Sequence, residues 1–291
     1  MKSHIFFFPI IVTIAAWLGL LAACTATTHE KPIVTVSIEP QKYLLEQITG
    51  DRVEVRTLIA NGANPETFDP SVNHIMNLAK SIGFLRMGNI GFEAAILDKV
   101  HGEHPDLPIF NTSIGVIPVT GTHSHDGVTH NVIDPHTWTS VKNVKIISKN
   151  MLNAMTEIDP SNASYYKTNY EHFAARLDSL DNAFTERLAP HKGEAFMVWH
   201  PSLSYFARDY GLEQIPAGSA DSKEMAMGAL KDVIDHAADH NMKVFFLQKD
   251  LDGRQAEALG AQLDIEKVTV NPLAYDWETE MTAIVDAIAG K

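Results

Sequence analysis

Histidines gather in one short part of this chain of 291 residues, and imidazole is a common metal ligand. Three lie within eight residues of one another: His123, His125 and His130. A fourth, His136, follows in the stretch Asp134-Pro135-His136-Thr137-Trp138, just before a helix that we expect to start with Ser140 as its cap. A single histidine behind a proline indicates little, but this one follows three others. We interpret His136 as one ligand of a metal site.

Two further positions are candidate ligands because each lies in a loop after a predicted strand. His200 comes directly after the strand expected over 194–199, and Pro201 and Ser202 then begin a helix. Glu66 lies in the loop 60–70, which follows the second predicted strand. Ligands of parallel sheets bind beyond the carboxyl ends of the strands. Both side chains are therefore expected to face a binding cleft.

The first 24 residues have the pattern of an export signal. Lys2 precedes an apolar run from Ile5 to Ala23, and the segment Leu21-Ala22-Ala23-Cys24 resembles the bacterial lipoprotein box. We expect cleavage before Cys24 and a lipid on its thiol, in preference to a retained transmembrane anchor. Since Cys24 is the one cysteine of the chain, metal coordination then depends on histidine, carboxylate and amide groups.

The charge of the exported part argues against nucleic acid as a partner. From Cys24 onward the chain has 268 residues with 22 basic and 36 acidic side chains, a net charge of −14. Binding to nucleic acid relies on lysine and arginine to neutralise phosphates, whereas a negative charge mildly favours cations. A chain of this length is also near the size at which one core divides into two.

The order of predicted elements indicates an α/β fold with two lobes, each a mainly parallel sheet flanked by helices. Short apolar strands alternate with amphipathic helices over 33–110 and again over 194–289, a rhythm typical of parallel sheets. The region 112–133 shows neither periodicity and is predicted to be a mobile surface loop.

One long helix is expected between the lobes, since an apolar stripe continues for about 28 positions after Asp159-Pro160-Ser161. A coiled coil is the alternative, but it needs a partner and a sustained heptad. We favour one rigid helix that bridges the lobes. The expected parts are a signal peptide with a lipidated cysteine at 1–24, an N-terminal metal-binding lobe at 32–158, the linking helix at 159–190 and a C-terminal metal-binding lobe at 191–291.

Four motifs in this order carry a resemblance to a known family. They are Gly62-Ala63-Asn64-Pro65-Glu66-Thr67-Phe68-Asp69-Pro70, Asp134-Pro135-His136-Thr137-Trp138, His200-Pro201-Ser202-Leu203-Ser204-Tyr205-Phe206 and Asn271-Pro272-Leu273. From Ile33 to its end the chain resembles the metal-binding lipoproteins of bacterial zinc and manganese ABC importers (cluster A-I). The resemblance implies two lobes bridged by one long helix, with one metal ion held between them by a ligand from each motif. It also implies an ABC permease as partner and a lipid-anchored periplasmic or cell-surface location; we expect a monomer.

Two positions depart from the family's usual pattern, which has histidine in place of Glu66 and aspartate in place of Asn271. The expected ligands are therefore His136, His200 and Glu66, with a weaker fourth partner left open among Asn271, Gln248 and water. Imidazole suits zinc, while manganese prefers oxygen, so zinc is expected and manganese is the alternative. The resemblance further implies that His123, His125 and His130 gather zinc near the main site.

Other sites and functions were weighed against this interpretation. His236 and His240 have the spacing of zinc-protease ligands, but Ala237 stands where those enzymes need a glutamate, and the helix has an acidic, solvated face. A secreted zinc hydrolase remains the alternative function, because two histidines and a carboxylate also hold catalytic zinc. The chain lacks the Gly-x-Ser-x-Gly, His-Glu-x-x-His and phosphate-loop motifs of hydrolytic enzymes. No motif indicates an adhesin.

Overall fold

The computed structural model describes residues 30–59, 63–125, 128–218, 235, 242–248, 254–263 and 265–290. The predicted export signal with Cys24 lies outside these residues, as do His236 and His240 and nearly all of the helix expected over 223–240. Residues from Pro32 onward belong to one unit. In the described residues no helix has both the length and the apolar character needed to cross a membrane.

The first sheet has four parallel strands in the order β2-β1-β3-β4. Its strands are β1 (Ile33–Val36), β2 (Glu54–Thr57), β3 (Gly83–Arg86) and β4 (Ile109–Asn111), and the helices between them are α1 (Glu39–Thr49), α2 (Val72–Leu78) and α3 (Gly91–Glu103). The central strand β1 is the most apolar, and Val34 and Val36 are fully buried. A strand covered on both faces loses its polar alternation, which explains why its short apolar run was readable from sequence.

The second sheet repeats this plan in the order β10-β9-β7-β8, again with parallel strands. Its elements are β7 (Ala195–Val198), α6 (Ser204–Tyr210), β8 (Glu213–Pro216), β9 (Val244–Gln248), α8 (Arg254–Gln262), β10 (Glu266–Val270) and α9 (Trp277–Ala289). Alternate residues of β7 enter different clusters: Phe196 and Val198 join the main core, and Met197 packs in a second cluster on the opposite face. The two predicted parallel sheets are thereby confirmed.

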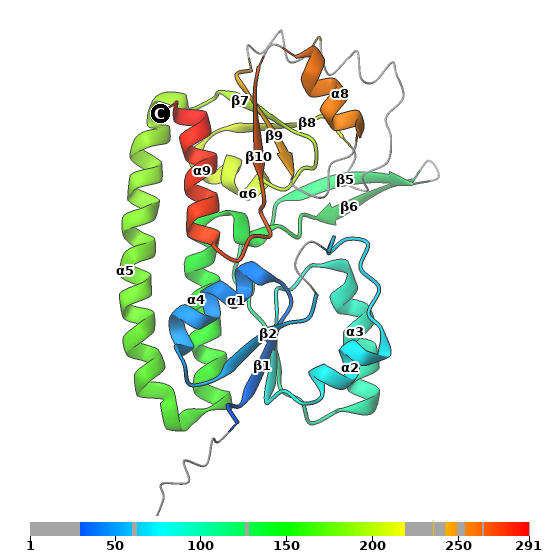
Figure 1. The fold of residues 1–291 in the computed structure, drawn as a ribbon, viewed down its shortest axis with the longest axis vertical. Coiled ribbons are helices and arrows are strands. Elements are labelled where there is room, and N and C mark those ends of the chain that lie inside the picture. The colour runs from blue at the N-terminus through cyan, green and yellow to red at the C-terminus, as the bar shows by residue number, and fades with distance from the viewer. Residues whose placement is uncertain are drawn as a thin grey trace, which may run out of the picture. The chain divides into compact units, whose positions relative to one another are not determined.

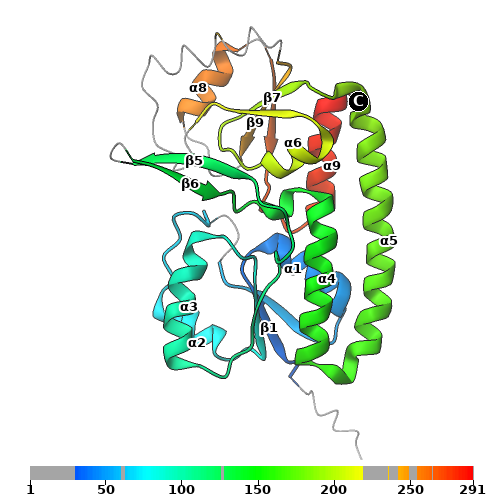
Figure 2. The ribbon, with the colours of Figure 1, turned by 180° about the vertical axis from the view of Figure 1, so that it is seen from behind.

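One helix of 26 residues, α5 (Ala163–Leu188), runs beside α4 (Val141–Ile158) and α9 (Figures 1 and 2). Short 3-10 turns, η2 (Pro160–Asn162) and η3 (Ala189–His191), precede and follow it. Its apolar stripe is buried in this chain: Tyr166, Phe173, Leu177, Phe184 and Leu188. The long helix is thus confirmed, and its apolar face is covered without the partner that a coiled coil needs.

The prediction of an irregular loop over 112–133 was wrong. An antiparallel hairpin forms there from β5 (Thr120–His125) and β6 (Val128–Ile133), and its register pairs His123 with His130. The hairpin belongs to neither main sheet and projects between them (Figure 1). A strand pair outside the core buries no regular apolar face, so its sequence lacks the alternation by which strands are recognised.

Candidate metal centre

Three of the predicted ligands come together in space. The Nε2 atoms of His136 and His200 are 3.3 Å apart, and Glu66 Oε1 lies 3.9 Å from the first and 3.5 Å from the second. These residues come from the loop after β2, the turn before α4 and the end of β7. They form a group whose ligand atoms all lie within 4.8 Å of one another.

The spacing of these atoms fits a single tetrahedral ion. Nitrogen and oxygen ligands at about 2.0–2.1 Å from zinc are about 3.3 Å apart when the geometry is tetrahedral. A cavity of about 10 Å³ lies between the same three side chains and is also lined by Gln248 and Asn64. That volume is enough for one small ion or one water molecule. The residues present therefore fit a metal of zinc size.

His136 is oriented by Asp134. Its backbone N–H and its Nδ1 both lie 2.8 Å from Asp134 Oδ1. Burial alone raises the pKa of Asp134, but the hydrogen bonds that its carboxylate accepts from His136 outweigh burial and hold that pKa below its ordinary value. An ionised carboxylate only accepts hydrogen bonds, so Nδ1 carries the proton and Nε2 presents its lone pair to the cavity.

His200 is the most enclosed ligand, with 5% of its surface exposed. It follows β7, and Gln248 is the last residue of the neighbouring strand β9, so both side chains start from the carboxyl end of the second sheet. Burial, and then the nearby imidazole of His136, lower the pKa of His200 to about 3. The ring therefore stays neutral, which is the form that binds metal.

Glu66 belongs to a loop that is held by its neighbours. Its backbone N–H donates to Asn64 Oδ1 at 2.8 Å, a local turn that directs the glutamate side chain. Two residues further on, the ring of Phe68 packs against the rings of His74 and Phe92 at 5.0 and 5.3 Å. The Glu66 side chain is one-quarter exposed, so the site is closed on the histidine side and more open on the carboxylate side.

The two candidates for a fourth ligand differ in position. Gln248 lines the small cavity, and its Nε2 donates to Ser202 Oγ at 2.9 Å. The amide oxygen is the atom of this side chain that suits a cation. Asn271 Oδ1 instead accepts from the Leu273 backbone at 3.2 Å, and Asn271 does not line this cavity. The neighbouring residues Pro272 and Leu273 do line it.

Sequence reasoning did not assign roles to three residues around the site. Asp134 supplies the carboxylate that orients His136. Its position two residues before His136 is the sequence signal that could have predicted this role. Trp138, in the 3-10 turn η1 (Thr137–Thr139), donates from Nε1 to the Pro272 carbonyl at 2.8 Å. Trp277 donates from Nε1 to the Trp138 carbonyl, also at 2.8 Å. No local pattern signals these two bonds, because each joins residues more than 130 positions apart.

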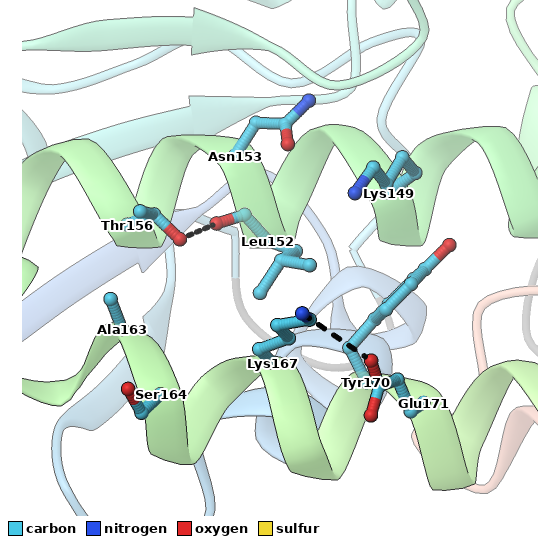
Figure 3. A pocket seen from close by; sticks show the side chains of 9 residues that line it. All are labelled: Lys149, Leu152, Asn153, Thr156, Ala163, Ser164, Lys167, Tyr170 and Glu171. Carbon is cyan, nitrogen blue, oxygen red and sulfur yellow. Dashed lines mark hydrogen bonds and ion pairs between the residues drawn. The ribbon is translucent and has the colours of Figure 1, made fainter.

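A larger cavity shows that volume alone does not identify the site. It measures about 440 Å³ and lies between α4 and α5, where none of its lining residues is a histidine (Figure 3). Lys167 and Glu171 form an ion pair at 3.8 Å within it, and Lys149 lies over the ring of Tyr170. Its charged groups are thus engaged with one another or with an aromatic ring.

Comparison with known proteins agrees with the fold and identifies relatives that are named as metal-binding proteins. A putative metal-binding protein of Chlamydia muridarum is 28% identical over 256 residues, 88% of this chain and 90% of that protein. The high-affinity zinc uptake system protein ZnuA of Bacillus subtilis is 25% identical over 277 residues, 89% of this chain and 86% of that protein. A crystal structure of ZnuA superposes with a TM-score of 0.80 at 31% identity and covers 89% of this chain and 98% of that one.

Two parallel sheets bridged by one long helix, with histidines and a carboxylate between them, define a substrate-binding protein of the metal ABC transporter class. The chain belongs to the family described as zinc-uptake complex component A, periplasmic, whose model matches residues 34–290. Its members are binding proteins and not enzymes, so the zinc hydrolase considered above is set aside. Family membership also indicates an extracytoplasmic location.

The buried neutral state of His200 makes the metal-free protein sensitive to acid. The folded-state pKa of about 3 lies below the ordinary value of 6.5. Between these two pH values His200 is protonated in the unfolded chain and neutral in the folded chain. Above pH 6.5 this residue does not reduce the free energy of unfolding. Below pH 6.5 that free energy falls by about 1.4 kcal/mol for each pH unit, until the pH reaches the folded-state pKa.

We expect His200→Gln to reduce the loss of unfolding free energy between pH 7.5 and 5.5, measured by denaturant titration of the chelator-treated full chain. His172→Gln, at an exposed histidine of α5, is the matched control and should leave the loss unchanged. An equal loss in wild type and His200→Gln would show that His200 does not carry this acid sensitivity.

Proposed function

We propose that the protein captures zinc outside the cytoplasmic membrane and delivers it to an ABC permease for import. The observation that carries the proposal is the convergence of two imidazoles and one carboxylate within 4.8 Å. Glu66, His136 and His200 act as the ligands, and Asp134 holds the first imidazole in the tautomer that binds metal.

Zinc is favoured over manganese by the ligand set. Imidazole nitrogen suits zinc, whereas manganese prefers carboxylate, carbonyl and water oxygens in octahedral geometry. The separations of 3.3, 3.5 and 3.9 Å match a four-coordinate ion more closely than a larger octahedral shell. The relatives include a high-affinity zinc uptake protein and the solved structure of ZnuA, which also supports zinc as the bound metal.

Delivery requires that the ion be released to a partner. A metal held by residues from three separate segments is released when any one of them is displaced, and the Glu66 loop is the most exposed of the three. We propose that docking on a permease moves this loop. The partition of the chain into lobes at 32–158 and 191–291 with a linking helix at 159–190 is part of the same proposal.

The central test is a calorimetric titration of the chelator-treated full chain with zinc and, separately, manganese. We expect one tight site that prefers zinc by at least about tenfold, and a loss of affinity beyond about 100-fold in His136→Ala and in His200→Ala, because loss of an orienting partner alone costs about 10–100-fold. His172→Ala is the control. Unchanged affinity and stoichiometry in both ligand variants would disprove the assignment.

The fourth ligand is proposed to be Gln248, on the basis of its place in the cavity wall. Gln248→Ala should weaken zinc binding by about tenfold, as expected for loss of one neutral contact near the ion. Asn271→Ala should change zinc affinity less than twofold, because the Asn271 side chain closes a local turn. The opposite ranking of the two variants in the same titration would assign the position to Asn271.

A lipid anchor at Cys24 is proposed from the sequence Leu21-Ala22-Ala23-Cys24. We expect the chain expressed in a bacterium to incorporate labelled fatty acid and to sediment with membranes, and Cys24→Ala to incorporate none. Stable attachment needs more than one acyl chain, since a single chain binds only marginally. Label retained in Cys24→Ala would rule out lipidation of this cysteine.

A further inference from the structure

The base of the β5–β6 hairpin departs from regular strand pairing just where the chain leaves it for His136. Thr120 pairs with Ile133, so Val119 and Asp134 are the next residues opposite each other. The Asp134 N–H donates to the Val119 carbonyl at 2.9 Å, as in a hydrogen-bonded pair. Two residues of such a pair normally exchange both of their N–H···O=C bonds. Here the return bond, from the Val119 N–H to the Asp134 carbonyl, is replaced by a side chain.

That side chain is Tyr205, the second residue of α6. Its hydroxyl accepts from the Val119 N–H at 3.3 Å and donates to the Asp134 carbonyl at 2.8 Å. One phenol thus satisfies both backbone groups that the strand pair leaves without each other. Tyr205 is fully buried, and burial raises the pKa of its phenol, so the hydroxyl keeps its proton and can donate it.

Tyr205 connects the two segments that carry the imidazole ligands. It follows His200 in the turn that leads into α6, and α6 lies against the base of the hairpin and the turn η1 (Figures 1 and 2). Through the backbone of Asp134 it holds the residue whose carboxylate orients His136. The two ligands are therefore joined by protein contacts that need no ion.

The ring of Tyr205 is itself held in place by Arg208, one turn further along α6. The Arg208 guanidinium lies over this ring at 5.0 Å from its centroid, and its Nη1 donates to the Ile117 carbonyl at 2.6 Å. Ile117 precedes the hairpin, so α6 grips the incoming strand at two points. A hydroxyl on a ring held in this way has a fixed position, and it can fix the position of what it binds.

We propose that Tyr205 is a positioning residue that sets the separation of His136 and His200, and through it the preference of the site for zinc. The separation of 3.3 Å between the two Nε2 atoms suits a four-coordinate ion with short bonds. Without the hydroxyl, Val119 and Asp134 are free to close their own hydrogen bond, which draws Asp134 away from α6 and moves the imidazole of His136. The inference rests on the zinc-binding function proposed above.

Tyr205→Phe removes the hydroxyl and keeps the ring. In calorimetric titrations of the chelator-treated full chain, we expect zinc affinity to fall by about tenfold, the smaller of the costs seen when a partner that orients a ligand is lost. Manganese affinity should change less than about twofold, because manganese takes a larger octahedral shell rich in oxygen and depends less on the spacing of two imidazoles. The preference for zinc over manganese therefore shrinks.

Tyr210→Phe is the matched control, because it makes the same change on the same helix. The Tyr210 hydroxyl is also buried, but it donates to Asp181 Oδ1 of α5 at 3.0 Å and not to the segment that carries His136. This variant should lower the free energy of unfolding, measured by denaturant titration, and leave both metal affinities unchanged. A loss of zinc preference in Tyr205→Phe alone is then not a consequence of lower stability.

A double-mutant cycle tests whether Tyr205 acts through His136. In the His136→Ala background, Tyr205→Phe should cause no further loss of zinc affinity, since the imidazole that the hydroxyl positions is absent. An equal loss in both backgrounds would show that the hydroxyl supports the fold in general, and the proposal would be wrong.

Two other results would overturn the proposal: wild-type zinc affinity in Tyr205→Phe, or losses of zinc and manganese affinity by the same factor. Either result leaves the metal-capture function standing, provided that the wild-type chain binds zinc and needs His136 and His200 to do so. If the wild-type chain binds no metal at all, the proposed function fails first, and the role of Tyr205 falls with it.

Discussion

Everything at this site depends on holding three metal-binding groups closer together than their own chemistry favours. Two imidazole nitrogens 3.3 Å apart, with a carboxylate 3.5–3.9 Å from each, are costly to assemble without a cation, because burial disfavours charge and the donors offer lone pairs to one another. The lowered pKa of His200 reflects this cost, because burial and the nearby imidazole of His136 both disfavour its charged form. An ion of suitable size would relieve that cost, and the affinity that we propose would then come from a geometry that the fold imposes beforehand.

The fold imposes this geometry through contacts between the parts that carry the ligands. The indoles of Trp138 and Trp277 join the turn after His136 to the segment after β10 by two hydrogen bonds of 2.8 Å. Tyr275, in that segment, donates to Glu46 of α1 at 2.5 Å. With α5 packed beside α1, α4 and α9, these bonds leave the loop that carries Glu66 as the most exposed part of the ligand set. The release that we propose would therefore begin at that loop.

Glu66 stands where the resemblance implies a histidine, so this position adds a negative charge to the site. The charge lies on the exposed side, where it faces both the cavity between the ligands and a larger cavity beside the hairpin. Asn271, where the resemblance implies an aspartate, contributes no charge and closes a local turn. One carboxylate thus remains among the proposed ligands, on the more exposed side of the site.

The sequence by itself determined the local elements and the kinds of ligand. Short apolar runs, the serine cap of α4 and Gly211 after α6 encode strands and helix ends through nearest-neighbour physics, and His136, His200 and Glu66 stood out because each lies in a loop beside such an element. Tertiary structure decided what local pattern does not encode. It placed His136 against His200, 64 positions away, brought Gln248 and not Asn271 to the cavity wall, paired Asp134 with His136, and folded the histidine-rich segment into a hairpin. These outcomes depend on how whole elements pack, and packing is set by contacts between distant residues that no window of sequence contains.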